Sequence, residues 1–360
     1  MCEIVHELPC RILHGRGAVE KLAGRLPEEK LVVMSEENLA QTEVFERIKT
    51  SFPKAKFYLQ WGGEPKISDV QRALDALRSD QPTAIVGVGG GSVLDVAKAT
   101  ALLIDKGKPA AEAMGHADMK RSVALALIPT TAGTGSETTP NCLLIDDRDG
   151  VKRALIAGGC VPDIAVLDPG ATRSLPAPVA AYTGVDALCH CVESSISVKA
   201  NEISRAWSLA GIRLILAYLP KAVMSPEDEE AREKMLFASF FGGAALAVAG
   251  TTAVHALAYS LGKRGVPHGV SNSLLFEMVM EHTLGEPRRY IEHYDDCVNL
   301  IHSLPIPTID RYNVQEQECE AMAREAMEQI RLLGNHPVQV TQACADRIFR
   351  SLFEKEGKRR

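Results

Sequence analysis

Residues 84–99 read AIVGVGGGSVLDVAKA, and the order of residue types in this stretch predicts the fold class. An apolar run typical of a buried strand is followed by Gly89, Gly90, Gly91 and Ser92, and then by a run of helical composition. The strands of a parallel sheet are joined by crossover connections that usually contain a helix. A strand, a glycine loop and a helix in succession therefore indicate an α/β domain.

The same alternation continues on both sides of this stretch. We expect strands at residues 31–34, 56–59, 84–88, 123–128 and 161–168. They predict a doubly wound, parallel Rossmann-like sheet. Beyond a proline-rich linker at 175–178, helices are expected at residues 181–197, 201–219, 228–262, 270–283, 313–333 and 339–354. We therefore expect an α/β dinucleotide-binding domain over residues 1–172 and an all-α domain over residues 173–360.

The composition excludes several classes of protein. Hydrophobic residues make up 46% and charged residues 24%, as in ordinary globular proteins. The net charge is −6 and no basic stripe is present, so we expect no nucleic-acid partner. The nine cysteines are scattered without a C-x-x-C pair, which fits reduced thiols, and the first residues, MCEIVHELPC, lack the pattern of an export signal. Together these features predict a cytoplasmic protein.

One stretch has the length of a membrane span. Residues 235–262 contain no Lys, Arg, Asp or Glu, and a span needs about 20 apolar residues. The stretch also contains glycines, hydroxyl residues and a histidine. We interpret it as a helix buried on all sides in the helical domain, and we expect no membrane partner.

The glycine loop at 89–92 is a candidate phosphate cradle. Glycines let backbone N–H groups approach a ligand closely, and the N-terminus of the following helix favours an anion. Ser92 and Asp95 have the spacing of a capping pair at positions N-cap and N3. A tight strand–helix turn is an equally good interpretation of the glycines alone, because the G-x-G-x-x-G spacing is absent.

A second polar loop, PTTAGTGSET at 129–138, follows the expected strand at 123–128. Open α/β sheets bind ligands at the carboxyl ends of their strands, so Thr130, Thr131 and Thr134 are candidate cofactor contacts. A solvated loop is the alternative. Glu36, at the end of another strand, is placed to accept hydrogen bonds from a ribose and to repel a 2′-phosphate. It favours NAD over NADP, unless it is a surface acid.

One carboxylate and three imidazoles form a candidate metal site in the helical domain. Asp186 and His190 are four residues apart, so they project from one face of a helix, and His255 and His268 follow later in the chain. This set of donors suits Fe²⁺, Zn²⁺, Mn²⁺, Co²⁺ or Ni²⁺. Such a metal is a Lewis acid that can stabilise an alkoxide. A structural core histidine is the alternative for His255.

Five stretches make the chain similar to the iron-containing, or group III, alcohol dehydrogenases. In chain order they are GVGGGSVLDVAKA (87–99), IPTTAGTGSET (128–138), VPDIAVLDP (161–169), TGVDALCHCVES (183–194) and VHALAYSLGKRGVPHGVSN (254–272). The resemblance implies two domains with an active site in the cleft between them, and NAD(P) bound to the glycine and threonine loops. It implies a divalent metal, most often Fe²⁺, on Asp186, His190, His255 and His268.

The resemblance also implies reversible hydride transfer between an alcohol or aldehyde and the nicotinamide, and a homodimer. The chain departs from the family at Tyr259, where members commonly have a second histidine that is implicated in proton transfer. We therefore take Tyr259, together with His268, as the candidate catalytic residues. The phenol has an ordinary pKa of about 10, which makes it a weaker base than histidine near neutrality.

Three other kinds of enzyme with a related fold are alternatives to an alcohol dehydrogenase. Tyr259 and the stretch 183–194 look similar to a branch that includes oxidases of a deoxy-octulosonate sugar acid. A metal-free reductase like the maleylacetate reductases is a second alternative, although the complete set of metal ligands argues against it. A lyase like the dehydroquinate synthases is a third, but no Lys/Arg cluster for a phosphate surrounds the ligand helices.

Overall fold

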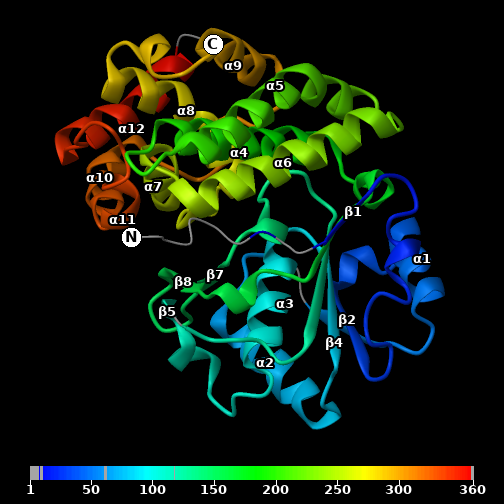
Figure 1. Cartoon of the computed structure of the whole chain (residues 1–360). Coiled ribbons are helices and arrows are strands. Elements are labelled where there is room, and N and C mark those ends of the chain that lie inside the picture. The colour runs from blue at the N-terminus through cyan, green and yellow to red at the C-terminus, as the bar shows by residue number, and fades with distance from the viewer. Residues whose placement is uncertain (1–7, 9–10, 61–62, 117, 358–360) are drawn as a thin grey trace. The chain divides into compact units, whose positions relative to one another are not determined.

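The computed structural model describes residue 8 and residues 11–60, 63–116 and 118–357. The chain divides into two compact units, Met1–Leu175 and Pro176–Arg360. In Figure 1 the first unit contains strands and helices, whereas the described residues of the second unit form helices joined by loops and no strands. The expected fold class, an α/β unit followed by an all-α unit, is therefore confirmed.

A six-stranded parallel sheet forms the centre of the first unit. Its strands are ordered β1-β9-β6-β4-β2-β3. Their bounds are β1 Arg11–His14, β2 Leu31–Glu36, β3 Lys56–Gln60, β4 Ala84–Gly89, β6 Ala124–Pro129 and β9 Ile164–Leu167. The α-helices of this unit are α1 Glu43–Ser51, α2 Ile67–Leu77 and α3 Gly91–Leu103. Single-turn 3-10 helices span Glu20–Leu22, Glu37–Leu39, Arg78–Asp80, Ala110–Ala113, Ser136–Thr138, Gly158–Cys160 and Pro169–Thr172.

Both faces of this sheet are buried, which explains the apolar runs that the sequence shows. Successive side chains of β4 point to opposite faces. Ile85 packs in one hydrophobic cluster with Leu94 of α3. Val86 packs in the cluster on the other face, which includes Ile48 of α1. A Cβ at Gly87 would lie 2.8 Å from the Cβ of Ala97, so glycine is what allows α3 to pack this closely on β4.

A small three-stranded sheet, ordered β5-β8-β7, completes the first unit. Its strands are β5 Gly115–His116, β7 Asn141–Ile145 and β8 Lys152–Ile156. The sequence analysis did not predict these strands or β1. They are short and partly exposed, and several of their positions are polar, so no continuous apolar run marks them.

The second unit consists of helices. Their bounds are α4 Ala177–Ile196, α5 Glu202–Met224, α6 Glu229–Ala249, α7 Ala253–Gly262, α8 His268–Leu284, α9 Tyr294–Ser303, α10 Cys319–Met327, α11 Ile330–Leu333 and α12 Gln342–Gly357. Single-turn 3-10 helices span Pro287–Arg289, Ile309–Arg311 and Glu316–Glu318. Helix α4 packs against α5, α6 and α8, and α8 packs against α7. This packing brings α4, α7 and α8 together around one region.

The expected single helix over residues 228–262 is wrong. The structure has two helices, α6 and α7, which are bent by 105° at a short break. Gly250, with φ +70°, ends α6, because its backbone conformation is one that other residues rarely adopt. Residues 231–261 are all buried or half-buried, as expected for a core segment. Helix α9 was not predicted, and the helix expected to end at residue 219 continues through Pro220 to Met224 as α5.

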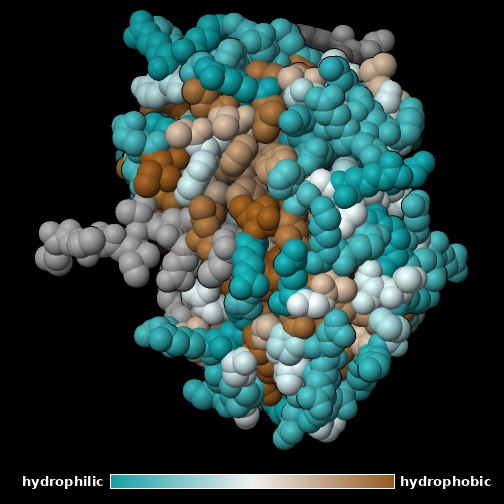
Figure 2. All heavy atoms as spheres, turned by 45° about the vertical axis from the view of Figure 1, so that its right-hand side comes forward, coloured by the Kyte–Doolittle hydropathy of each residue, from teal (hydrophilic) through white to brown (hydrophobic). Residues whose placement is uncertain are grey.

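By length and composition alone, α5 could cross a membrane, as could α6 and α7 if the bent pair were one span. Of these helices, only residues 235–262 were expected from the sequence to have the length of a span. The most apolar window of α5 is 39% buried. Figure 2 shows one face of the molecule, on which hydrophilic side chains predominate and hydrophobic ones form patches among them.

Candidate dinucleotide and metal sites

The glycine loop lies where the sequence analysis places it, between β4 and α3. Gly89 ends the strand, Gly90 is the N-cap of α3, and Gly91 begins the helix. Gly90, Gly91 and Ser92 are half-buried. A Cβ at Gly91 would lie 2.6 Å from the Thr134 side chain, so glycine is required for this approach. The N-terminus of a thirteen-residue helix is therefore open to an anion.

The threonine loop meets the glycine loop at the same edge of the sheet. Strands β4 and β6 are neighbours and run parallel, so the loops that follow them lie side by side. The Thr130 N–H donates a hydrogen bond to the Gly89 carbonyl oxygen at 3.0 Å. Thr130 is buried, whereas Thr131 and Thr134 are half-buried. The structure thus brings the candidate cofactor residues of the two loops together.

The predicted capping pair of Ser92 and Asp95 is wrong, because α3 begins one residue before Ser92. The Asp95 carboxylate instead accepts hydrogen bonds from the Ser136 hydroxyl at 2.6 Å and the Leu143 N–H at 2.8 Å. It also pairs with the buried Lys98, whose Nζ donates to the Ser136 carbonyl oxygen at 3.0 Å. Asp95 therefore anchors the end of the threonine loop to α3.

Glu36 ends β2, the strand beside β4, and is half-buried. Burial raises the pKa of its carboxyl above the usual value, and contacts with Asn38 and the Gly90 backbone act in the opposite direction. The contact with Gly90 places the carboxylate next to the glycine loop. Glu36 is therefore not a remote surface acid.

The candidate metal donors converge in the second unit. The Nε2 atoms of His255 and His268 each lie 3.6 Å from Asp186 Oδ1, and His190 Nε2 lies 3.8 Å from it. The donor atoms of Asp186, His255 and His268 all lie within 4.8 Å of one another. His190 is outside that group of three, but its ring stacks on the ring of His255 with centroids 4.8 Å apart.

These separations fit a single cation. Atoms that each lie about 2.1 Å from a tetrahedral metal are about 3.4 Å from one another. The observed 3.6–3.8 Å from Asp186 Oδ1 is close to that value and too long for direct hydrogen bonds. Three helices supply the donors, with Asp186 and His190 one turn apart on α4, His255 on α7 and His268 at the start of α8.

The buried carboxylates of Asp186 and Glu193 give this region a negative charge. Burial opposes ionisation of Asp186, but the imidazoles of His190, His268 and His255 outweigh it and hold the pKa of this carboxyl well below its usual range. Burial lowers the pKa of His255, but Glu193 and Asp186 outweigh it and raise this pKa to about 9. The site therefore favours a positive charge.

The sequence analysis missed Glu193, which is fully buried on α4. Its Oε2 contacts His255 Nδ1. Its Oε1 accepts hydrogen bonds from the N–H groups of Thr252 and Val254, both at 2.9 Å, at the start of α7. Glu193 thus orients a candidate ligand and caps the helix that carries it. Its spacing from Asp186 and His190, seven and three residues, puts it on the same face of α4 and could have indicated this role.

Tyr259 lies one turn after His255 on α7 and is half-buried. Its ring stacks on the ring of His268, with centroids 6.0 Å apart. The phenol is therefore a neighbour of the metal donors, as the sequence analysis expects for a residue that takes part in proton transfer.

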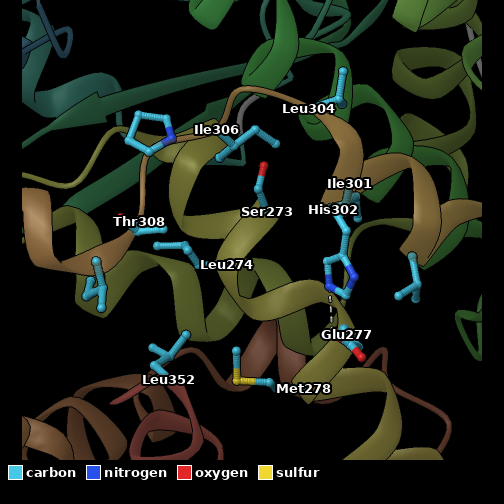
Figure 3. Close-up of a pocket in the computed structure, with 13 residues that line it drawn as sticks. Ser273, Leu274, Glu277, Met278, Ile301, His302, Leu304, Ile306, Thr308 and Leu352 are labelled. Atoms are coloured by element: carbon cyan, nitrogen blue, oxygen red, sulfur yellow. Dashed lines mark hydrogen bonds and ion pairs between the residues drawn. The ribbon is translucent and has the colours of Figure 1, made fainter. Parts of the chain in front are cut away.

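A separate pocket of about 100 Å³ lies beside another face of α8. Figure 3 shows Ser273, Leu274, Glu277 and Met278 of α8 on one side, with His302 of α9 paired to Glu277 at 3.0 Å. No predicted site residue is among those that line it. The pocket is therefore distinct from the metal centre.

Comparison with known protein families gives two matches that together cover most of the chain. Residues 9–169 match the model described as iron-containing alcohol dehydrogenase. Residues 180–292 match the C-terminal model of the Fe-containing alcohol dehydrogenase family.

Individual proteins agree with these matches. The chain is 30% identical to long-chain-alcohol dehydrogenase 1 of Geobacillus thermodenitrificans over 94% of both chains. It is 41% identical to the probable alcohol dehydrogenase EutG of Salmonella typhimurium, but that match covers 61% of this chain and only 56% of the relative. The crystal structure of an iron-containing alcohol dehydrogenase from Thermotoga maritima is 29% identical, with a TM-score of 0.85 over 97% of this chain and 99% of that chain.

Proposed function

Because the chain belongs to the iron-containing alcohol dehydrogenase family, we propose that it is a metal-dependent, NAD-linked alcohol dehydrogenase that also reduces aldehydes. The observation that carries this proposal is the convergence of the Asp186, His190, His255 and His268 donor atoms on one buried place. The substrates are small-molecule alcohols and aldehydes, in keeping with relatives named 1-propanol dehydrogenase and NAD-dependent methanol dehydrogenase.

Asp186, His190, His255 and His268 hold the metal in this proposal. A divalent cation in this site supplies a Lewis acid, which polarises the substrate oxygen and lowers the pKa of the alcohol. Nitrogen and oxygen donors of this kind bind both Fe²⁺ and Zn²⁺. We assign Fe²⁺ as the working metal, on the family resemblance, and Zn²⁺ as the alternative. Glu193 keeps the His255 ring turned so that Nε2 faces the other donors.

The glycine and threonine loops hold the dinucleotide in this proposal. Backbone N–H groups at Gly90, Gly91 and Ser92 face the pyrophosphate at the N-terminus of α3, and Thr130, Thr131 and Thr134 flank it. The role of Asp95 is to hold the threonine loop rather than to bind the cofactor directly. Glu36, next to Gly90, binds the ribose and disfavours NADP.

Tyr259 passes the proton between the substrate oxygen and solvent in this proposal, and its stacking on His268 holds the phenol beside the metal donors. The homodimer that the family resemblance implies is testable by size-exclusion chromatography with light scattering.

The test is to measure the metal content and NAD-linked activity of protein purified without oxygen or chelators. About one equivalent of iron per chain and NAD reduction with short alcohols would support the proposal. One equivalent of zinc with the same activity would replace Fe²⁺ by Zn²⁺. A metal-free protein that oxidises NADH with a carbonyl acid would contradict it and favour a metal-independent reductase.

A further inference from the structure

Asn272 is a buried polar residue of α8 that neither the ligand set nor the cofactor loops account for. It lies four residues after His268, so both side chains project from one face of the helix. Its side chain is fully buried. A buried amide is costly unless it has partners, so these partners indicate its role.

Every hydrogen-bond partner that the structure gives this side chain is a proposed metal donor. Asn272 Nδ2 lies 2.7 Å from Asp186 Oδ1 and 3.3 Å from the Nε2 atoms of both His255 and His268. None of these contacts involves the backbone, so the amide does not cap a helix or close a turn. The oxygen Oδ1 is buried without a hydrogen-bond partner. A leucine of similar size would fill the same space without that cost, so packing alone does not explain Asn272.

We propose that Asn272 is a positioning residue of the metal centre, which holds the Asp186 carboxylate in the arrangement that binds a divalent cation together with the neighbouring imidazoles. This inference rests on the proposed function, because it takes these atoms as the metal donors. Asn272 is not itself a ligand: its Nδ2 hydrogens fix Asp186 Oδ1, and the donors then bind the metal.

Asn272→Leu tests the inference, with Ser271→Ala as the matched control. Ser271 is the preceding residue of α8 and is also fully buried, but its hydroxyl donates only to the carbonyl oxygens of Val266 and Pro267. Zn²⁺ affinity is measured for the full chain by competition with a chelator. We expect Asn272→Leu to weaken Zn²⁺ binding about 10–100-fold, as loss of an outer partner of a metal ligand does, and Ser271→Ala to leave it unchanged.

Two further measurements separate positioning from a structural role. The thermal midpoint of the metal-free protein should not fall in Asn272→Leu, because the variant removes an unpartnered oxygen. The visible spectrum of the Co²⁺-loaded protein should change shape in this variant and not in Ser271→Ala, because the donors move. If Asn272→Leu does not fold, Asn272→Ser, which is smaller and still polar, takes its place.

An unchanged Zn²⁺ affinity in the variant would overturn the inference while leaving the proposed function intact. A loss of affinity matched by an equal loss of metal-free stability would also overturn it. A Co²⁺ spectrum showing that the wild type has one more ligand than Asn272→Leu would make Asn272 a ligand instead of a positioning residue. A wild-type protein that binds neither Zn²⁺ nor Co²⁺ would overturn the proposed function and this inference together.

Discussion

Single side chains decide whether the metal centre works, and His268 is the most informative of them. It begins α8, and its Nε2 lies 3.6 Å from Asp186 Oδ1. His268→Ala should abolish metal binding and activity together, with a loss of metal affinity larger than the roughly 10–100-fold that removal of an outer partner costs. NAD affinity should change little, because the dinucleotide loops belong to the other unit. Metal analysis, turnover and NAD titration check this; surviving activity would contradict a metal mechanism.

Tyr259 tests the proton path. Tyr259→Phe keeps the ring that stacks on His268 and removes only the hydroxyl. We expect turnover to fall by about 10²-fold or more, as for loss of a general acid or base, with metal content unchanged. The alkaline limb of the pH–rate profile should change in the variant. An identical profile in the two proteins would remove Tyr259 from the reaction.

Glu36 tests cofactor choice. Glu36→Gly should raise the ratio of kcat/KM for NADP to that for NAD by about tenfold or more, equivalent to about 1.4 kcal/mol, because the carboxylate that repels a 2′-phosphate is lost. Glu37→Ala is the control, since Glu37 is the exposed acid that follows it. Equal ratios in wild type and Glu36→Gly would show that Glu36 does not select the cofactor.

At the scale of elements, the fit of α3 against the threonine loop depends on one missing Cβ. A Cβ at Gly91 would lie 2.6 Å from the Thr134 side chain, whereas a Cβ at Gly90 would meet Thr131 at an ordinary 3.5 Å. Gly91→Ala should therefore destabilise the protein by about 1–3 kcal/mol, as overpacking does, and Gly90→Ala by much less. Urea unfolding curves of the two variants compare them directly. Equal stability of the two variants would mean that the threonine loop shifts to make room for the added Cβ without a loss of stability.

Elements with a continuous signal were predictable from the sequence. The strands β2, β4, β6 and β9 are apolar because the sheet is buried on both faces at their positions, whereas β3 lies at the edge and was predicted from Phe57, Tyr58 and Leu59. Gly250 ends α6, but the start of α7 was not predictable, because it is capped by Glu193, some 60 residues earlier in the chain. The short strands β5, β7 and β8 lack an apolar run, so only their pairing in space defines them.

The candidate site also contains residues that could be predicted from the sequence and residues that could not. The convergence of the four candidate donors was predictable, because Asp186 and His190 share a helix face and the other two histidines belong to a recognisable motif. The partners of those ligands, Glu193 and Asn272, are ordinary polar residues in sequence, and only the packing of α4, α7 and α8 shows what they contact. The assignment of roles to these residues stays a prediction until the variants are measured.

For the molecule as a whole, two buried groups, one in each unit, respond to pH with opposite sign. Burial raises the pKa of Glu137, in the first unit, to about 7, and neither of its carboxylate oxygens has a hydrogen-bond partner. Burial lowers the pKa of His336, in the second unit, to about 4, and its Nδ1 also lacks a hydrogen-bond partner. Each change corresponds to about 3 kcal/mol of stability.

The signs follow from which state binds the proton. The carboxyl of Glu137 has a pKa of about 7 in the folded protein and an ordinary pKa of 4.5. It therefore keeps its proton longer when folded, and its contribution to stability falls as pH rises from 4.5 to 7. The imidazole of His336 has an ordinary pKa of 6.5, so it takes up a proton more readily in the unfolded chain than in the folded protein. Its contribution to stability is therefore present above pH 6.5 and is lost as pH falls toward 4. In the wild type the two effects largely cancel between pH 4.5 and 6.5.

Single variants should expose each effect. Glu137→Gln should be more stable than wild type by up to about 3 kcal/mol at pH 8 and should lose that advantage at pH 4.5. The stability of His336→Gln should instead increase relative to that of the wild type as pH falls from 6.5 to 4. Urea unfolding of each protein across this pH range measures both differences, and a pH-independent difference in either variant would contradict burial as the cause.

The same series tests the division of the chain. The first compact unit ends at Leu175 in the chain, and the domain boundary expected after residue 172 stays a prediction. If the units unfold as separate domains, Glu137→Gln should move only the transition of the first unit and His336→Gln only that of the second. Limited proteolysis with mass analysis of the surviving fragment is the readout. A shift of both transitions by either variant would show that the chain unfolds as one cooperative unit.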